Sequence, residues 1–136
     1  MPIPYTKLLF KDPEAPVLEL EVISMIDETK REVVGAILDS GSSITLIPGG
    51  LRRNISPQLT GKETIVDIIG READRLLYDV KIVFQKYPRL KLPVIQAAEG
   101  GFRAKGSAFA IIGRDILNSF KLVLDGPNLE FDVIKP

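Results

Sequence analysis

The residues best placed to do chemistry are an acid followed by small and hydroxyl residues, Asp39-Ser40-Gly41-Ser42-Ser43. An apolar stretch from Ala36 to Leu38 precedes the acid, and a second one from Ile44 to Ile47 follows the serines. A strand that ends in a carboxylate can present it from a loop to a cleft, where neighbouring hydroxyls orient it and keep it ionised. Gly41 permits a positive φ and a close approach of backbone. The same residues also fit an ordinary turn in which Asp39 caps its own backbone.

The chain lacks two residue types on which many enzymes depend, because it contains no His and no Cys. Their absence excludes Ser-His-Asp and Cys-His triads, thiol nucleophiles, disulfides and ordinary zinc sites. Any enzymatic proton transfer must therefore use carboxylates, Lys or Tyr. We expect neither a metal nor a cofactor.

Length and composition indicate one soluble globular domain over residues 1–136, with 45% hydrophobic and 26% charged residues. Eighteen basic residues balance eighteen acidic ones, so the formal net charge is zero and nucleic acid is not an expected partner. The first residues lack a basic targeting segment, and no apolar run approaches the roughly 20 residues of a membrane span. We therefore expect a cytoplasmic location and no membrane partner.

Hydrophobic patterning predicts a mostly β chain. The expected strands are Val17–Ile26, Arg31–Leu38, Ile44–Ile47, Thr64–Ile69, Arg75–Phe84, Leu90–Ala97, Ala108–Ile112, Lys121–Leu124 and Leu129–Val133. Residues 51–59 have too few periodic apolar positions to indicate a helix, and residues 99–107 are expected to form a polar loop. The segment Arg114–Phe120 suits one short helix. Many short strands with one helix in this length favour a closed or sandwiched β domain.

Two further segments complete the set of candidate motifs. Ala110-Ile111-Ile112 leads into Gly113-Arg114-Asp115, which is an apolar strand followed by a glycine and the expected helix. Ile68-Ile69-Gly70-Arg71 lies at the tip of an expected hairpin in the middle of the chain. Each segment alone is typical of an ordinary junction or turn.

Taken in order, these motifs resemble those of the retropepsin-like aspartic proteases: an apolar strand running into Asp-Ser-Gly, a middle flap hairpin, and an apolar-apolar-Gly strand before a short helix. The matching parts extend from residue 18 to residue 124, which is most of the chain. The resemblance implies an all-β, closed β-barrel with the acid-protease fold of one lobe and one short C-terminal helix. It also implies assembly as a homodimer.

The resemblance implies a role for each matching residue. Asp39 is the catalytic acid, Ser40 hydrogen-bonds across the dimer axis, Gly41 presents backbone to the substrate, and the Ser42 hydroxyl contacts the catalytic carboxylate. The flap residues that close over the substrate are Ile68, Ile69, Gly70 and Arg71. The residues that support the Asp39 loop from beneath are Ile111, Ile112, Gly113 and Arg114.

One departure from the family pattern concerns Arg114. Retroviral members have acidic residues shortly after the Asp-Thr/Ser-Gly motif, and these pair with the arginine of the late motif. Here Ser43, Ile44 and Thr45 stand in that stretch. We therefore expect Arg114 to pair with Asp115 or with the opposite chain.

The chain contains a single Asp-Ser-Gly, and the other Asp-Gly pair, Asp125-Gly126, lacks the following hydroxyls. Two carboxylates sharing one proton can hydrolyse a peptide bond, so a working pair requires Asp39 from two chains on a two-fold axis. The resulting hypothesis is a homodimeric aspartic endopeptidase acting on extended peptides. Two alternatives stay open: a retropepsin-like domain without catalysis that serves in binding or assembly, and an unrelated monomeric β-barrel in which Asp39 occupies a mere turn.

Overall fold

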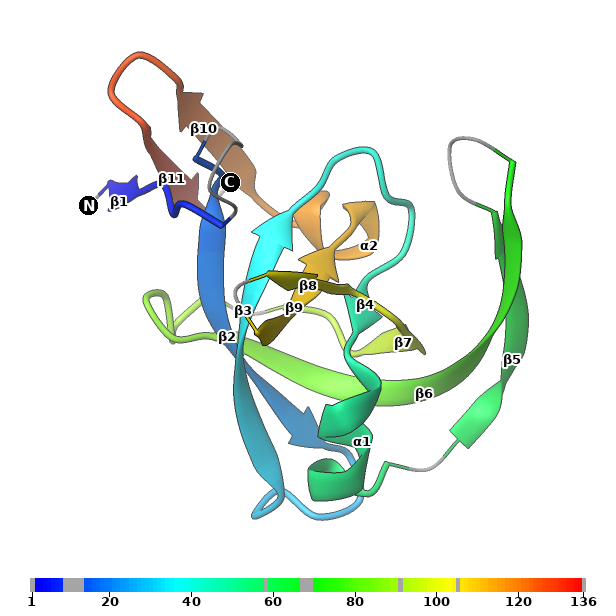
Figure 1. The fold of residues 1–136 in the computed structure, drawn as a ribbon. Coiled ribbons are helices and arrows are strands. Elements are labelled where there is room, and N and C mark those ends of the chain that lie inside the picture. The colour runs from blue at the N-terminus through cyan, green and yellow to red at the C-terminus, as the bar shows by residue number, and fades with distance from the viewer. Residues whose placement is uncertain are drawn as a thin grey trace.

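The computed structural model of the protein describes residues 2–8, 14–57, 59–66, 70–90, 92–104 and 106–135. This part of the chain forms a closed six-stranded β-barrel with a separate three-stranded sheet beside it (Figure 1). The barrel strands are, in spatial order, β2 (Val17–Ser24), β3 (Arg31–Leu38), β9 (Ser107–Ile112), β4 (Leu46–Ile47), β7 (Ile95–Glu99) and β6 (Glu72–Phe84). The barrel closes because β2 pairs with both β3 and β6. The closed barrel predicted from the sequence is therefore confirmed.

β2 alternates between apolar and polar residues from Leu18 to Val22, whereas β3 is largely apolar and alternates in burial, so the two strands pair as a hairpin with one face in the core. On β3 the alternate residues Val34, Ala36 and Leu38 are buried in the core. The Ser24 N–H donates to the Lys30 carbonyl and closes the turn between the strands. Both the hairpin and its turn agree with the sequence-based prediction.

β9 pairs in parallel with β3, although the paired residues are more than 70 positions apart in the sequence. The short strand β4 then lies between β9 and β7, antiparallel to the first and parallel to the second. These pairings bring the ends of β3 and β9 to the same end of the barrel. They therefore place together two of the motifs singled out in the sequence.

The predicted flap hairpin consists of β5 (Leu59–Val66) paired with the first half of β6. β6 begins at Glu72, three residues earlier than expected, and the register runs to the pair Val66 and Glu72. Figure 1 shows this hairpin extending away from the barrel, with its tip at the end where the chain leaves β3. Residues 67–69 lie outside the described residues.

Two elements differ from the prediction because their local patterns were weak. A helix, α1 (Gly49–Ile55), forms where no helix was expected, and of its residues only Ile55 is fully buried. Packing of that one side chain is a tertiary effect that a periodicity of seven residues does not reveal. The segment 102–107 is not a simple loop, because β8 (Phe102–Ala104) pairs with the start of β9.

Two boundaries also required correction. β7 (Ile95–Glu99) begins only after Pro93, whereas a strand from Leu90 was expected, and it lies between β4 and β6. Proline cannot donate a ladder hydrogen bond, which explains why the strand starts beyond it. The helix α2 (Arg114–Leu117) ends three residues before the expected Phe120.

The separate sheet joins both ends of the chain, with β11 (Glu130–Ile134) between β1 (Ile3–Pro4) and β10 (Lys121–Asp125). β10 and β11 form the hairpin predicted from the turn at Asp125-Gly126. We call these three strands the terminal sheet. It is anchored by Phe131, which is buried and in ring contact with Tyr5. No helix of the described residues is long and apolar enough to cross a membrane.

Candidate active site

Asp39 is the first residue after β3 and is exposed at the end of the barrel. Leu38 is paired with Ile112, the last residue of β9, and the Asp39 N–H donates to the Ile112 carbonyl at 2.9 Å. The parallel pairing thus fixes where Asp39 leaves the sheet, with Gly113 leaving beside it. Ile111 and Ile112 pair with Ile37 and Leu38, the two residues of β3 that come directly before Asp39.

The Asp39 carboxylate folds back onto its own loop, because Oδ1 accepts a hydrogen bond from the Gly41 N–H at 2.8 Å. A Cβ on residue 41 would lie 3.1 Å from that oxygen, so a larger residue would crowd the carboxylate. The φ of Gly41 is not positive, so the loop does not depend on the positive φ that a glycine permits. The glycine is therefore explained by close approach. Among the described residues no other hydrogen bond reaches the carboxylate, and Asp39 is exposed.

Ser42 stabilises the loop, but its hydroxyl does not form the expected contact with the Asp39 carboxylate. Its N–H donates to the main-chain carbonyl of Asp39 at 3.2 Å, which closes the turn. Its hydroxyl donates instead to the carbonyl of Ile44 at 2.6 Å. A hydroxyl committed to a local carbonyl stabilises the loop and leaves orientation of the acid to Gly41.

Arg114 joins the two motifs directly. Its Nη1 donates to the Ser40 carbonyl at 2.7 Å, and its backbone N–H donates to the Ser42 carbonyl at 2.8 Å. Arg114 therefore takes backbone oxygens of the Asp39 loop as its partners, and not Asp115 as expected. A charged donor on a carbonyl strengthens the hydrogen bond and fixes the position of Ser40 next to the acid.

Asp115 and Thr45 form a second connection that the sequence analysis missed. The Asp115 carboxylate accepts from the Thr45 N–H at 2.9 Å and from the Thr45 hydroxyl at 2.7 Å. The same hydroxyl accepts from the Gly113 N–H at 3.1 Å, and Thr45 is fully buried. The sequence offered two signals for this connection, Thr45 shortly after the Asp39 motif and Asp115 after Gly113-Arg114. Neither residue alone indicates that the two are in contact.

Gly113 is required by the same junction. A Cβ there would lie 2.6 Å from both the carbonyl carbon and the oxygen of Ile44. Its backbone is extended, with φ −95° and ψ −175°, so any residue could adopt the conformation and only the contact forbids one. The close approach of the Ile44 backbone therefore explains this glycine.

The flap residues are placed only in part. Gly70 has a φ of +87°, which fits its predicted position in the turn, and Arg71 is exposed beside it. The other two predicted flap residues, Ile68 and Ile69, lie outside the described residues. Figure 1 shows the hairpin on one side of the barrel end from which the Asp39 loop emerges.

A pocket of about 400 Å³ touches the Asp39 loop. Ser43 and Ile44 form one wall, residues 93–96 form another, and Asp115 closes it. Among the described residues no group of three or more acidic, His or Cys side chains is arranged to hold a metal ion.

The arrangement offers one accessible carboxylate on a loop whose backbone is held at several points. Such a group can act as a general base on water, but alone it supplies no second acid to polarise a carbonyl. No family model matches the chain, and no curated protein matches it either. What Asp39 does must therefore follow from its surroundings and from elementary chemistry.

Proposed function

We propose that the protein is a homodimeric aspartic endopeptidase in which two copies of Asp39 activate a water molecule. The observation that supports this most directly is the parallel pairing of β3 with β9, which holds an exposed carboxylate at the barrel end. The loop around it is fixed by Arg114, Thr45 and Asp115. A carboxylate held by a loop that is itself fixed by hydrogen bonds is the kind of preorganised group that a functional site requires.

The chemistry follows from sharing one proton between two acids. One Asp39 carboxylate takes a proton from water while the other, protonated, donates a hydrogen bond to the scissile carbonyl oxygen. The water oxygen bonds to the carbonyl carbon. The resulting intermediate collapses when the amide nitrogen receives the proton that the first carboxylate took from water and the C–N bond breaks, which leaves one proton on the pair as at the start. Two like charges this close cannot both ionise at moderate cost, so the pair holds the proton that the reaction needs.

The second acid must come from a second chain, because the other Asp-Gly is already used in a turn. Asp125 accepts from the backbone N–H and the side-chain amide of Asn128, within the hairpin of the terminal sheet. A two-fold axis near the Asp39 loop would pair the two carboxylates, and each contact would occur twice. The terminal sheet is the surface we propose for this contact, since β10 is an unpaired edge among the described strands.

The experiment combines solution mass with one conservative substitution. We expect the native chain to have twice the 15.0 kDa mass of one copy and to cleave a peptide library or casein. Asp39→Asn should keep that mass and lose at least about a thousandfold in cleavage rate, as removal of an essential base does. The control is Asp79→Asn, which changes another exposed aspartate, on β6, and should retain activity.

Each outcome selects one function. Cleavage at full rate by Asp39→Asn would refute the proposed chemistry. A dimer that cleaves nothing, with or without the substitution, would favour the non-catalytic binding or assembly module. A monomeric mass would favour the unrelated barrel in which Asp39 belongs to a turn.

A further inference from the structure

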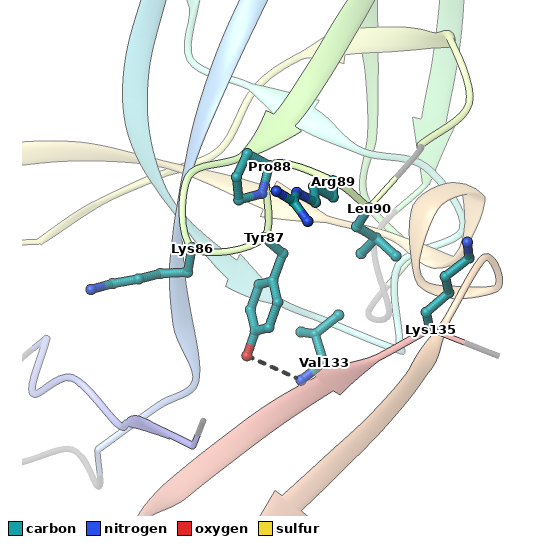
Figure 2. Close-up of a pocket in the computed structure, with 7 residues that line it drawn as sticks. All are labelled: Lys86, Tyr87, Pro88, Arg89, Leu90, Val133 and Lys135. Atoms are coloured by element: carbon teal, nitrogen blue, oxygen red, sulfur yellow. Dashed lines mark hydrogen bonds between the residues drawn. The ribbon is translucent and has the colours of Figure 1, made fainter.

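We propose that a second site, between the turn after β6 and strand β11, binds an acidic peptide segment through one apolar anchor residue. The site is a pocket of about 440 Å³, larger than the one beside the Asp39 loop, and Asp39 does not line it. Figure 2 shows its walls: residues 86–90 of the turn on one side and β11 on the other. The volume lies within the range of about 300–1,000 Å³ that is typical of ligand sites.

The floor of this pocket is apolar and held in place. Tyr87, Leu90 and Val133 supply it, and Val133 is buried. The Tyr87 hydroxyl donates to the Asp132 carboxylate at 2.7 Å and accepts from the Val133 N–H at 3.4 Å. These hydrogen bonds fix the ring, so an apolar side chain can bind without first ordering the pocket.

The rim is basic. Lys86, Arg89 and Lys135 are exposed, and none of them forms an ion pair or side-chain hydrogen bond within the described residues. The one carboxylate close to the floor, that of Asp132, already accepts from Tyr87 and from the Val133 N–H. Since the whole chain has no net charge, three cations around one pocket are a local excess.

The placement of the cations selects the occupant. In Figure 2 Lys86 and Lys135 lie on opposite sides of the Tyr87 ring, and Arg89 lies above the ring, between Pro88 and Leu90. A peptide with an aromatic or aliphatic side chain in the pocket and acidic residues before and after it would meet all three while covering the apolar floor.

In the context of the proposed function this pocket is an exosite, where part of a protein substrate binds away from the cleaved bond. That use depends on the peptidase activity, but binding of the segment does not. The two can therefore be tested separately.

Binding is measured by fluorescence anisotropy with a labelled Glu-Glu-Phe-Glu-Glu probe and the full chain carrying Asp39→Asn, which prevents cleavage of the probe. We expect saturable binding that weakens about tenfold when Lys86→Ala, Arg89→Ala and Lys135→Ala are combined, since three exposed ion pairs of about 0.5 kcal/mol each are lost. The matched control removes three other exposed cations, Lys30, Arg53 and Lys62, and should bind the probe as the parent does.

The apolar anchor is tested by changing the probe, which leaves the protein intact. A probe with Gly in place of Phe should bind about tenfold more weakly, because the floor then stays uncovered. No binding of the Phe probe, equal binding by the triple variant, or equal binding of the Gly probe or of a short thymidine oligonucleotide would each overturn the proposal. In the active protein, fusing the acidic segment to a cleavable peptide should lower KM about tenfold, and the triple variant should abolish that gain with kcat unchanged. If the probe binds but nothing is cleaved, the site stands and the peptidase function fails.

Discussion

The Thr45 hydroxyl joins two backbone segments that are 68 residues apart in the sequence, because it accepts from the Gly113 N–H and donates to Asp115. Gly113 also lies against the Ile44 backbone, and the Ile44 carbonyl accepts from the Ser42 hydroxyl of the Asp39 loop. Thr45 is fully buried, and its hydrogen bond with the Gly113 N–H is buried while that with Asp115 is partly buried, so removal of the hydroxyl leaves the Gly113 N–H without a partner. A single atom therefore couples the acid loop to the start of α2.

Replacing Thr45 with Val tests this coupling at nearly constant volume. Thr45→Val leaves the Gly113 N–H unsatisfied and removes a donor from the Asp115 carboxylate, so we expect a loss of about 3 kcal/mol in the free energy of unfolding. Urea denaturation at fixed protein concentration measures it. Thr45→Ser keeps the hydroxyl and should lose only about 1 kcal/mol for the missing methyl group. Equal midpoints for the two variants would show that the hydroxyl contributes nothing.

A second residue-scale prediction concerns the contact between Gly113 and Ile44. Gly113→Ala places a methyl group against the Ile44 backbone, which cannot rotate away, so we expect a loss of about 2 kcal/mol or more. Gly50→Ala is the matched control in α1, where nothing lies within 4 Å of the added atom. There alanine should stabilise by up to about 1 kcal/mol. Thermal unfolding of both variants gives the comparison, and equal stability would remove the steric explanation of Gly113.

At the scale of elements, local pattern was sufficient where apolar strands are bounded by a recognisable turn. β3 was predicted with its observed bounds, and the hairpin of β10 and β11 within two residues, because each combines apolar positions with a recognisable turn. α1 was not predicted because it buries one side chain, and β8 was not because its pairing depends on β9. At the site, sequence indicated Asp39 and Gly113 but not the partners of Ser42, Arg114 and Asp115, which exist only once the two ends meet.

The attachment of the terminal sheet to the barrel depends on pH through Tyr87 and Asp132. The hydrogen bond from Tyr87 lowers the pKa of Asp132 below its ordinary value of 3.8. Burial, together with that hydrogen bond, raises the pKa of Tyr87 above its ordinary value of 10.0. A lowered carboxyl pKa stabilises the fold above pH 3.8 and less as the pH falls through the lowered value. A raised phenol pKa stabilises it below pH 10 and less as the pH rises further.

The Tyr87→Phe variant should therefore have a lower free energy of unfolding than the parent, chiefly between the ordinary pKa values of 3.8 for Asp132 and 10.0 for Tyr87. We expect the difference in free energy of unfolding to be constant near neutral pH, to shrink as the pH falls below about 4, and to shrink again above about 10. Urea midpoints measured at a series of pH values give the profile. A difference that stays the same from pH 3 to pH 11 would mean that the hydroxyl acts only through packing.

For the whole molecule, the apolar side of the terminal sheet extends beyond what the barrel covers. Leu122 and Val133 form a cross-strand pair that packs against the core, whereas Leu124, the next residue on that face of β10, is 55% exposed. Beside it β10 has no strand partner among the described residues along one edge. An unpaired edge with an exposed apolar side chain is the kind of surface that a second strand covers.

If that second strand is β10 of another copy, Leu124→Asp should separate the dimer, because two carboxylates would meet near the two-fold axis. We expect the mass in solution to fall to 15.0 kDa, the far-ultraviolet circular dichroism to stay unchanged, and peptide cleavage to disappear with the second Asp39. Ile26→Asp is the control, since Ile26 is 66% exposed in the turn between β2 and β3 and should leave mass and cleavage as they were. If the dimer persists with full activity in the Leu124→Asp variant, the two-fold contact does not involve β10. A monomer that still cleaves would mean that one Asp39 is enough, against the charge argument on which the paired mechanism depends.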